Sequence, residues 1–277
     1  MCQNVDPMQN STLILHTIPG YISNLFLVQH PGEGLLLLDC GAPGDVERIS
    51  QYCHRELGTS ISDIRLAVVS HMHPDHAGAA YILRDRYGIP IAAHKRADRW
   101  YRGLGGMFQH RLDSTMMQFV AKSQGRRLEN NRYPRILHPD YSLKDLDFLP
   151  LFPSWQVISA PGHTLHDIAL YNKKEKLLYV GDCIVMVEGE VRLPLPVLFP
   201  HLMRESLLRL ASLDFSTLLL AHGQVVKKEE ARQVLHKAIK LLDEPPNAVM
   251  RSVFWLSVHP LEVKKEYWRR KKNSQKR

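Results

Sequence analysis

Long apolar runs and paired cysteines are both missing from this chain. No stretch of about 18 consecutive apolar residues occurs, so the sequence predicts no membrane-spanning helix. The first residues lack the basic start and apolar middle of a signal peptide, and we therefore expect a cytoplasmic protein. None of the 4 cysteines forms a CxxC pair, which excludes a zinc knuckle and a thioredoxin-like motif. We expect these thiols to be reduced and buried.

Acidic residues are scarcer than basic ones, with 28 Asp and Glu against 36 Lys and Arg, a net charge of +8. Part of the excess lies in a basic C-terminal tail from about residue 262. This tail could contact nucleic acid or an anionic membrane, or it could be a solvated terminus. Because no known nucleic-acid motif accompanies the charge, we expect a small-molecule substrate and no nucleic-acid partner. The oligomeric state does not follow from the sequence.

Apolar runs alternate with amphipathic stretches along most of the chain, which is typical of an α/β protein. With 277 residues, the chain is expected to form a single domain over residues 1–277. The predicted strands cover residues 13–18, 24–28, 35–38, 66–69, 91–93, 156–159, 168–171, 177–180 and 217–220. The predicted helices cover about residues 45–55, 77–87, 203–213 and 227–242.

Residues from about 96 to 140 interrupt this alternation, and we interpret them as a mostly helical insertion. Their arginines and aromatic residues could form the wall of a substrate pocket, or the segment could be a helical cap with a solvated basic face. The candidates for a pocket wall are Arg99, Trp100, Tyr101 and Arg102. Because the insertion holds none of the metal-capable residues described next, we expect metal binding to be independent of it.

Four metal-capable side chains lie within six residues, directly after the apolar strand predicted at 66–69. In a tight turn, alternate residues can converge on one point while their neighbours face another. His71 and His73 could therefore bind one metal, and Asp75 and His76 a second. Imidazole and carboxylate ligands suit zinc, and also iron or manganese. Asp75 could in addition orient an attacking water, which makes it the candidate catalytic residue.

Three further polar residues follow apolar strands in the same way, each with small residues beside it. They are His163, Asp182 and His222. Functional sites in α/β proteins gather at the carboxyl ends of strands. The sequence therefore predicts that these three side chains join the first four.

The pattern HxHxDH, followed by a later His, Asp and His, resembles the signature of the metallo-β-lactamase superfamily, and the chain matches every position. The resemblance covers roughly residues 13–95 and 155–240. It implies an αββα sandwich of two mixed β-sheets with outer helices, and two divalent metal ions, with zinc expected first. By this resemblance, the first ion is bound by His71, His73 and His163, the second by Asp75, His76 and His222, and Asp182 bridges both.

Two other features belong to the same comparison. The early Asn and the Asp-x-Gly of the family appear as Asn24 and as Asp39 with Gly41, and the resemblance implies that Asp39 supports the metal ligands. The segment 162–167 departs from many relatives, and its His166 could face the pocket or could hydrogen-bond backbone nearby.

The resemblance implies a hydrolase in which a metal-bound water loses a proton near neutral pH and attacks the substrate. Ser70 lacks the G-x-S-x-G setting of a nucleophilic serine. The complete ligand set argues against a classical β-lactamase, the short insertion against an RNA-processing enzyme, and His73 against a flavo-diiron protein. We therefore expect a glyoxalase II-like or lactonase-like hydrolase of a small ester, thioester or lactone.

Two other activities stay open. Persulfide dioxygenases of the same superfamily keep HxHxDH but use one iron, bound by two His and one Asp. The positive net charge leaves room for a nuclease or phosphodiesterase. Val185 stands where quorum-quenching lactonases often have tyrosine, which argues against an acyl-homoserine lactonase in particular.

Overall fold

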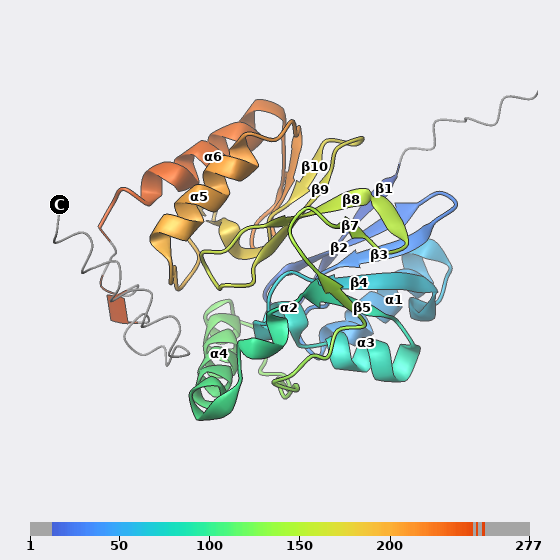
Figure 1. Cartoon of the computed structure of the whole chain (residues 1–277). Coiled ribbons are helices and arrows are strands. Elements are labelled where there is room, and N and C mark those ends of the chain that lie inside the picture. The colour runs from blue at the N-terminus through green and yellow to red at the C-terminus, as the bar shows by residue number, and fades with distance from the viewer. Residues whose placement is uncertain (1–12, 246–247, 249–250, 253–277) are drawn as a thin grey trace, which may run out of the picture.

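Two β-sheets packed face to face, with helices on their outer sides, form the αββα sandwich that the sequence predicts (Figure 1). This computed structural model describes residues 13–245, 248 and 251–252. Within those residues, no helix combines the length and the apolar character needed to cross a membrane. The basic tail from about residue 262 lies outside the described residues.

The first sheet is mixed. Strands β3 to β6 run parallel, whereas β1, β2 and β3 pair antiparallel. In spatial order the strands are β1 (Ile14–Pro19), β2 (Asn24–His30), β3 (Gly34–Leu38), β4 (Ile64–Val69), β5 (Ile91–His94) and β6 (Tyr141–Leu143).

The second sheet is also mixed, because β10 and β13 are parallel while its other neighbours are antiparallel. In spatial order its strands are β14 (Val225–Lys227), β13 (Thr217–Leu219), β10 (Leu177–Tyr179), β9 (Ile168–Asn172), β8 (Phe152–Ser159) and β7 (Phe148–Leu149). A separate hairpin consists of β11 (Val185–Val187) and β12 (Glu190–Arg192).

The helices are α1 (Asp45–Leu57), α2 (Pro74–Ala77), α3 (Ala80–Tyr87), α4 (Gly103–Ser123), α5 (Pro200–Ala211) and α6 (Lys228–Leu241), with 3₁₀ turns η1 (Ile61–Asp63), η2 (Ala97–Arg99) and η3 (Gly181–Cys183).

The prediction of a single helix over residues 77–87 is wrong at the start of that range, because α2 ends before Gly78 and α3 begins after it. A Cβ at Gly78 would lie 2.1 Å from the Pro74 carbonyl oxygen and 3.1 Å from the Ala42 Cα. The chain passes too close to its neighbours there for a side chain.

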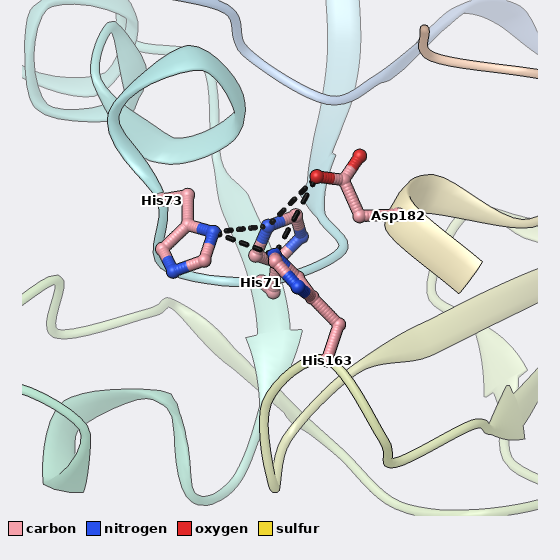
Figure 2. Close-up of side chains that lie close together, drawn as sticks. All are labelled: His71, His73, His163 and Asp182. Atoms are coloured by element: carbon pink, nitrogen blue, oxygen red, sulfur yellow. Dashed lines mark hydrogen bonds and ion pairs between the residues drawn. The ribbon is translucent and has the colours of Figure 1, made fainter. Parts of the chain in front are cut away.

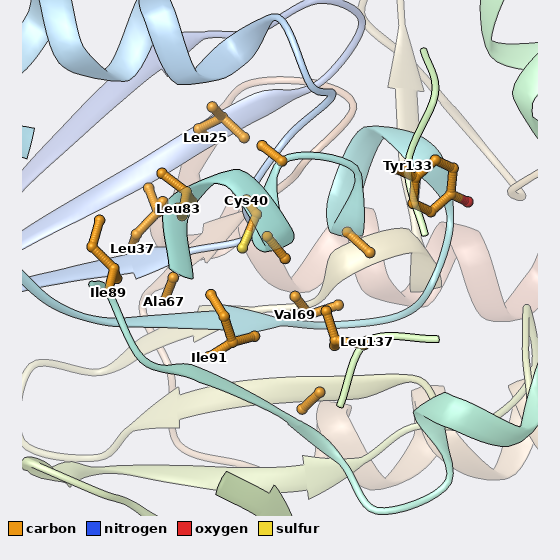
Figure 3. Packing of buried hydrophobic residues seen from close by; sticks show 14 of the residues in the cluster. Leu25, Leu37, Cys40, Ala67, Val69, Leu83, Ile89, Ile91, Tyr133 and Leu137 are labelled. Carbon is orange, nitrogen blue, oxygen red and sulfur yellow. The ribbon is translucent and has the colours of Figure 1, made fainter. Parts of the chain in front are cut away.

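The central strands of both sheets are buried on both faces, which explains their continuous apolar runs, whereas the edge strands are partly exposed. In β2, Leu25 and Leu27 pack toward the helices, whereas Phe26 and Val28 pack between the two sheets. Figure 3 shows the core on the helix side of the first sheet. Successive side chains of a strand point to opposite faces of the sheet. When both faces are covered, apolar residues are therefore favoured at successive positions.

Cysteines behave as the sequence predicts in the part of the chain that is described. Cys40, Cys53 and Cys183 are buried and free of disulfides. Burial raises the pKa of each thiol, so they are protonated at neutral pH and pack as small apolar residues.

The segment 96–140 lies between β5 and β6. Its first part contains η2 and α4, and residues 124–140 contain neither helix nor strand. Helix α4 lies beside α2, the short helix that carries part of the HxHxDH motif. The segment is therefore next to the predicted metal site.

Candidate metal centre

All seven predicted ligand side chains meet at one end of the sandwich, on the loops that follow β4, β8, β10 and β13. They form two groups, and within each group the potential ligand atoms lie within 4.8 Å of one another. We call the first group, His71, His73, His163 and Asp182, the three-histidine cluster. We call the second group, Asp75, His76 and His222, the two-histidine cluster.

In the three-histidine cluster, ring nitrogens of three imidazoles converge (Figure 2). His73 Nδ1 lies 3.0 Å from His71 Nε2 and 2.8 Å from His163 Nε2. Asp182 Oδ2 lies 3.8 Å from His71 Nε2 and 3.5 Å from His163 Nε2. Three nitrogen lone pairs and one carboxylate oxygen can thus share one cation.

The two-histidine cluster combines imidazoles and carboxylates. Asp75 Oδ2 lies 3.0 Å from His222 Nε2 and 3.4 Å from His76 Nε2. The second oxygen of Asp182, Oδ1, lies 3.1 Å from His76 Nε2 and 3.4 Å from His222 Nε2. Asp182 therefore turns one oxygen to each cluster, which is the geometry of a bridging carboxylate.

Four of the five histidines place Nε2 in a cluster and have a partner for Nδ1. Such contacts fix the orientation of the ring and the position of its proton. The four partners of Nδ1 are the Ser70 hydroxyl for His71 at 3.1 Å, the Asp39 carboxylate for His76 at 2.6 Å, the Pro196 carbonyl for His163 at 2.7 Å, and the Ile22 carbonyl for His222 at 3.2 Å.

Asp39 is buried beneath the metal centre, at the carboxyl end of β3. Its backbone has a φ of 61°, in the left-handed region. Its carboxylate accepts hydrogen bonds from the Ser70 amide at 2.6 Å, the Ser70 hydroxyl at 2.7 Å and the Tyr179 hydroxyl. Its contact with His76 is the support that the sequence comparison implies for this residue.

Protonation differs between the two clusters. Burial lowers the pKa of His71, of His163 and of His73, the last to about 4. Burial also opposes protonation of His76, but the carboxylates of Asp182, Asp75 and Asp39 outweigh it and raise the His76 pKa well above its usual value. The imidazoles of the three-histidine cluster are therefore neutral at pH 7, whereas protons compete with a metal for the imidazole of His76.

Two buried atoms at the centre show whether the site suits a metal ion. His76 Nε2 and Asp182 Oδ1 lie 3.1 Å apart without the angles of a hydrogen bond, and neither atom has a hydrogen-bond partner elsewhere among the described residues. A buried polar atom without a partner costs about 1–3 kcal/mol. A cation bound between them would satisfy both, and the imidazole and carboxylate donors suit zinc, iron or manganese.

His166 does not join either cluster. Its Nε2 accepts a hydrogen bond from the Met72 amide at 3.0 Å, and its ring packs on Trp100 with 5.3 Å between centroids. Burial lowers its pKa well below the usual value, so the ring is neutral and accepts this bond. Of the two interpretations left open by the sequence, the bond to backbone is the one observed.

The segment 96–140 reaches the metal centre through one of its side chains. Trp100 is 3% and Tyr101 0% exposed, so Tyr101 does not line an open pocket. Asp113, which the sequence did not single out, lies 3.5 Å from His73 Nε2. The expectation that metal binding is independent of this segment stays a prediction, and the contact between Asp113 and His73 is the feature that bears on it.

Comparison with known proteins agrees with the fold. The sequence model of the metallo-beta-lactamase superfamily matches residues 18–222. The probable metallo-hydrolase YflN of Bacillus subtilis (strain 168) is 26% identical over 228 residues, which cover 76% of this chain and 83% of that protein.

Solved structures show the same fold. The metallo-beta-lactamase family protein TTHA1429 from Thermus thermophilus is 21% identical, with a TM-score of 0.62, and the match covers 94% of this chain and 93% of that protein. TTHA1623, solved in a di-iron-bound form, is 23% identical, with a TM-score of 0.53, and the match covers 77% of this chain and 94% of that protein.

Proposed function

Because the chain belongs to the metallo-β-lactamase superfamily, we propose that it is a hydrolase that binds two divalent metal ions and cleaves a small ester, thioester or lactone. The observation that carries this proposal is Asp182, whose two oxygens face the two clusters. A carboxylate in that position can hold two ions close together. We assign the first ion to His71, His73 and His163, the second to Asp75, His76 and His222, and the bridge to Asp182.

The bound ions would supply an activated water as nucleophile and positive charge to stabilise the oxyanion of the transition state. Asp75 is our candidate for orienting that water. Burial would raise the pKa of Asp75, but the imidazoles of His76 and His222 outweigh it and lower the pKa well below its usual range. The carboxylate is therefore ionised and can accept a hydrogen bond from water. Ser23 stabilises the loop by donating its hydroxyl to the Asp75 carbonyl at 3.0 Å.

Zinc is the ion that we propose for both positions, because five imidazoles and two carboxylates match its preferred ligands. Iron and manganese are the alternatives to be tested. Metal analysis of the purified protein distinguishes them. Two zinc ions per chain would support the proposal, and a chain that binds no metal after loading would overturn it.

Hydrolysis is tested on a panel of thioesters, lactones and phosphodiesters with the metal-loaded protein and a chelator-treated control. Chelator-sensitive cleavage of an ester, thioester or lactone supports the proposal. Cleavage of phosphodiesters alone would favour a nuclease. One iron per chain with oxygen uptake would favour a persulfide dioxygenase-like enzyme.

We make two further proposals, one on localisation and one on domain organisation. Free, buried thiols are typical of a reducing compartment, which supports the cytoplasm. We also propose that residues 1–277 form one metallo-β-lactamase-like domain, in which the segment 96–140 is an insertion beside the active site. Limited proteolysis would test this organisation, since a separate domain would be released as a stable fragment.

A further inference from the structure

His73 differs from the other four histidines of the metal centre in the nitrogen that it turns inward. It presents Nδ1 to His71 and His163, so its Nε2 points away from the cluster (Figure 2). The other four rings present Nε2 and anchor Nδ1 on a nearby oxygen of the first or second sheet or its loops. His73 therefore needs an anchor on its opposite side, where α4 lies.

The group on that side is the carboxylate of Asp113. Its Oδ2 lies 3.5 Å from His73 Nε2, and the side chain is 10% exposed. Two other donors fix the carboxylate, since the Tyr101 hydroxyl donates to Oδ2 at 2.8 Å and Gln109 Nε2 donates to Oδ1 at 2.7 Å. The carboxylate is thus held in one orientation before any ligand binds.

The sequence of α4 explains why Asp113 faces inward. Gly106, Gln109, Met117 and Ala121 are the buried residues of this helix, and Asp113 continues their spacing of three to four residues. Gly106 allows Tyr101 to pack under the helix, because a Cβ at this position would lie 2.1 Å from the Tyr101 carbonyl carbon. A carboxylate on a buried helical face requires polar partners.

We propose that Asp113 is a positioning residue for His73. It accepts the Nε2 proton, keeps the Nδ1 lone pair directed at the three-histidine cluster, and so connects α4 to metal binding. The expected effect of Asp113 on metal affinity rests on the proposed function. The expected effect on the tautomer of His73 does not. A partner of this kind typically contributes about 10–100-fold to metal affinity.

The first test uses Asp113→Asn in the full chain. The amide keeps the size of the side chain but leaves one acceptor oxygen for three donors, His73, Tyr101 and Gln109. We expect one of the two metals to bind about 10–100-fold more weakly in competition with a chromophoric chelator, and the visible spectrum of one Co²⁺ ion to change. Unchanged affinity and spectrum would overturn the proposal.

The matched control is Asp98→Asn, in the same segment. Asp98 accepts hydrogen bonds from the Leu137 and His138 amides, which lie outside both clusters. If this variant weakens metal binding as much as Asp113→Asn does, the effect comes from general loosening of the segment, and the positioning role is refuted.

The second test needs no metal. Nitrogen-15 NMR of the metal-free protein, with the His73 resonances identified by a His73→Ala variant, reports which ring nitrogen carries the proton. We expect the proton on Nε2 in the natural protein and a shift toward Nδ1 in Asp113→Asn. A proton on Nδ1 in the natural protein would overturn the inference, even if two metals bind and the hydrolase proposal stands.

Discussion

The three-histidine cluster and the two-histidine cluster share Asp182 but differ in what surrounds their imidazoles. For His71, His73 and His163 burial is the largest influence and outweighs any neighbouring carboxylate, so their pKa values are lowered. His76 lies among three carboxylates, and its pKa is raised. Two positions with similar donor atoms can therefore differ in how strongly protons compete with a metal, because burial and charge act in opposite directions on the imidazole.

Removal of the shared carboxylate should have the largest effect. Asp182→Ala should lose at least one of two bound metals, because each cluster loses an oxygen ligand at the same time. The measurement is metal content after exhaustive dialysis. Asp214→Ala is the control, since Asp214 is exposed and pairs with Lys176. Full metal content in Asp182→Ala would contradict the bridging role.

Asp39→Asn should weaken metal binding in one cluster more than in the other. Asp39 contacts His76 and no other cluster histidine, so the metal of the two-histidine cluster should bind about 10–100-fold more weakly while the other is less affected. Stepwise metal titration resolves the two events. An equal loss at both positions would show that Asp39 supports the whole centre rather than one half.

The pH dependence of metal binding should also differ between the two clusters. The raised pKa values of His76 and His222 mean that protons occupy these rings at a higher pH than they would occupy an ordinary imidazole, and each competing proton weakens metal binding about tenfold per pH unit. Burial lowers the pKa of His73 to about 4 and also lowers the pKa values of His71 and His163, so the three-histidine cluster should keep its metal to a lower pH than the two-histidine cluster. Metal content after dialysis at a series of pH values tests this order, and simultaneous release of both ions would refute it.

The smallest effect is expected for Tyr179→Phe. This change removes one of the hydrogen bonds that Asp39 accepts and leaves both bonds from Ser70. A single bond to a charged group contributes about 1.5–3 kcal/mol, and the remaining donors compensate for part of it. We expect a loss of metal affinity smaller than that of Asp39→Asn, confined to the two-histidine cluster. A larger loss than in Asp39→Asn would contradict the view that Tyr179 acts through Asp39.

The seven side chains of the two clusters could be found from the sequence because each follows an apolar strand. Strand ends meet at one edge of a sheet, so residues as distant as His71 and His222 are brought together by a rule that needs no side-chain detail. The αββα architecture followed from the resemblance, and the structure confirms it.

Other features could not be found in this way. Strands β6, β7 and the β11–β12 hairpin are only two or three residues long, too short for a periodic pattern. Helix α2 ends before Gly78, which packs closely against Ala42, a contact between residues that are distant in the sequence. Asp113 was not singled out from the sequence, because its contact with His73 depends on how α4 packs against a distant part of the chain.

The sequence by itself determined the chemistry of the metal centre, because HxHxDH and three strand-end residues specify which donor atoms are available. The tertiary structure alone decided how each ring is held. The carbonyls of Ile22 and Pro196 and the carboxylate of Asp113 reach their histidines from distant parts of the chain. Backbone carbonyls carry no residue identity, and the approach of α4 to His73 depends on packing across the fold. For this reason, the anchors of the ligands follow from the folded chain and not from local pattern.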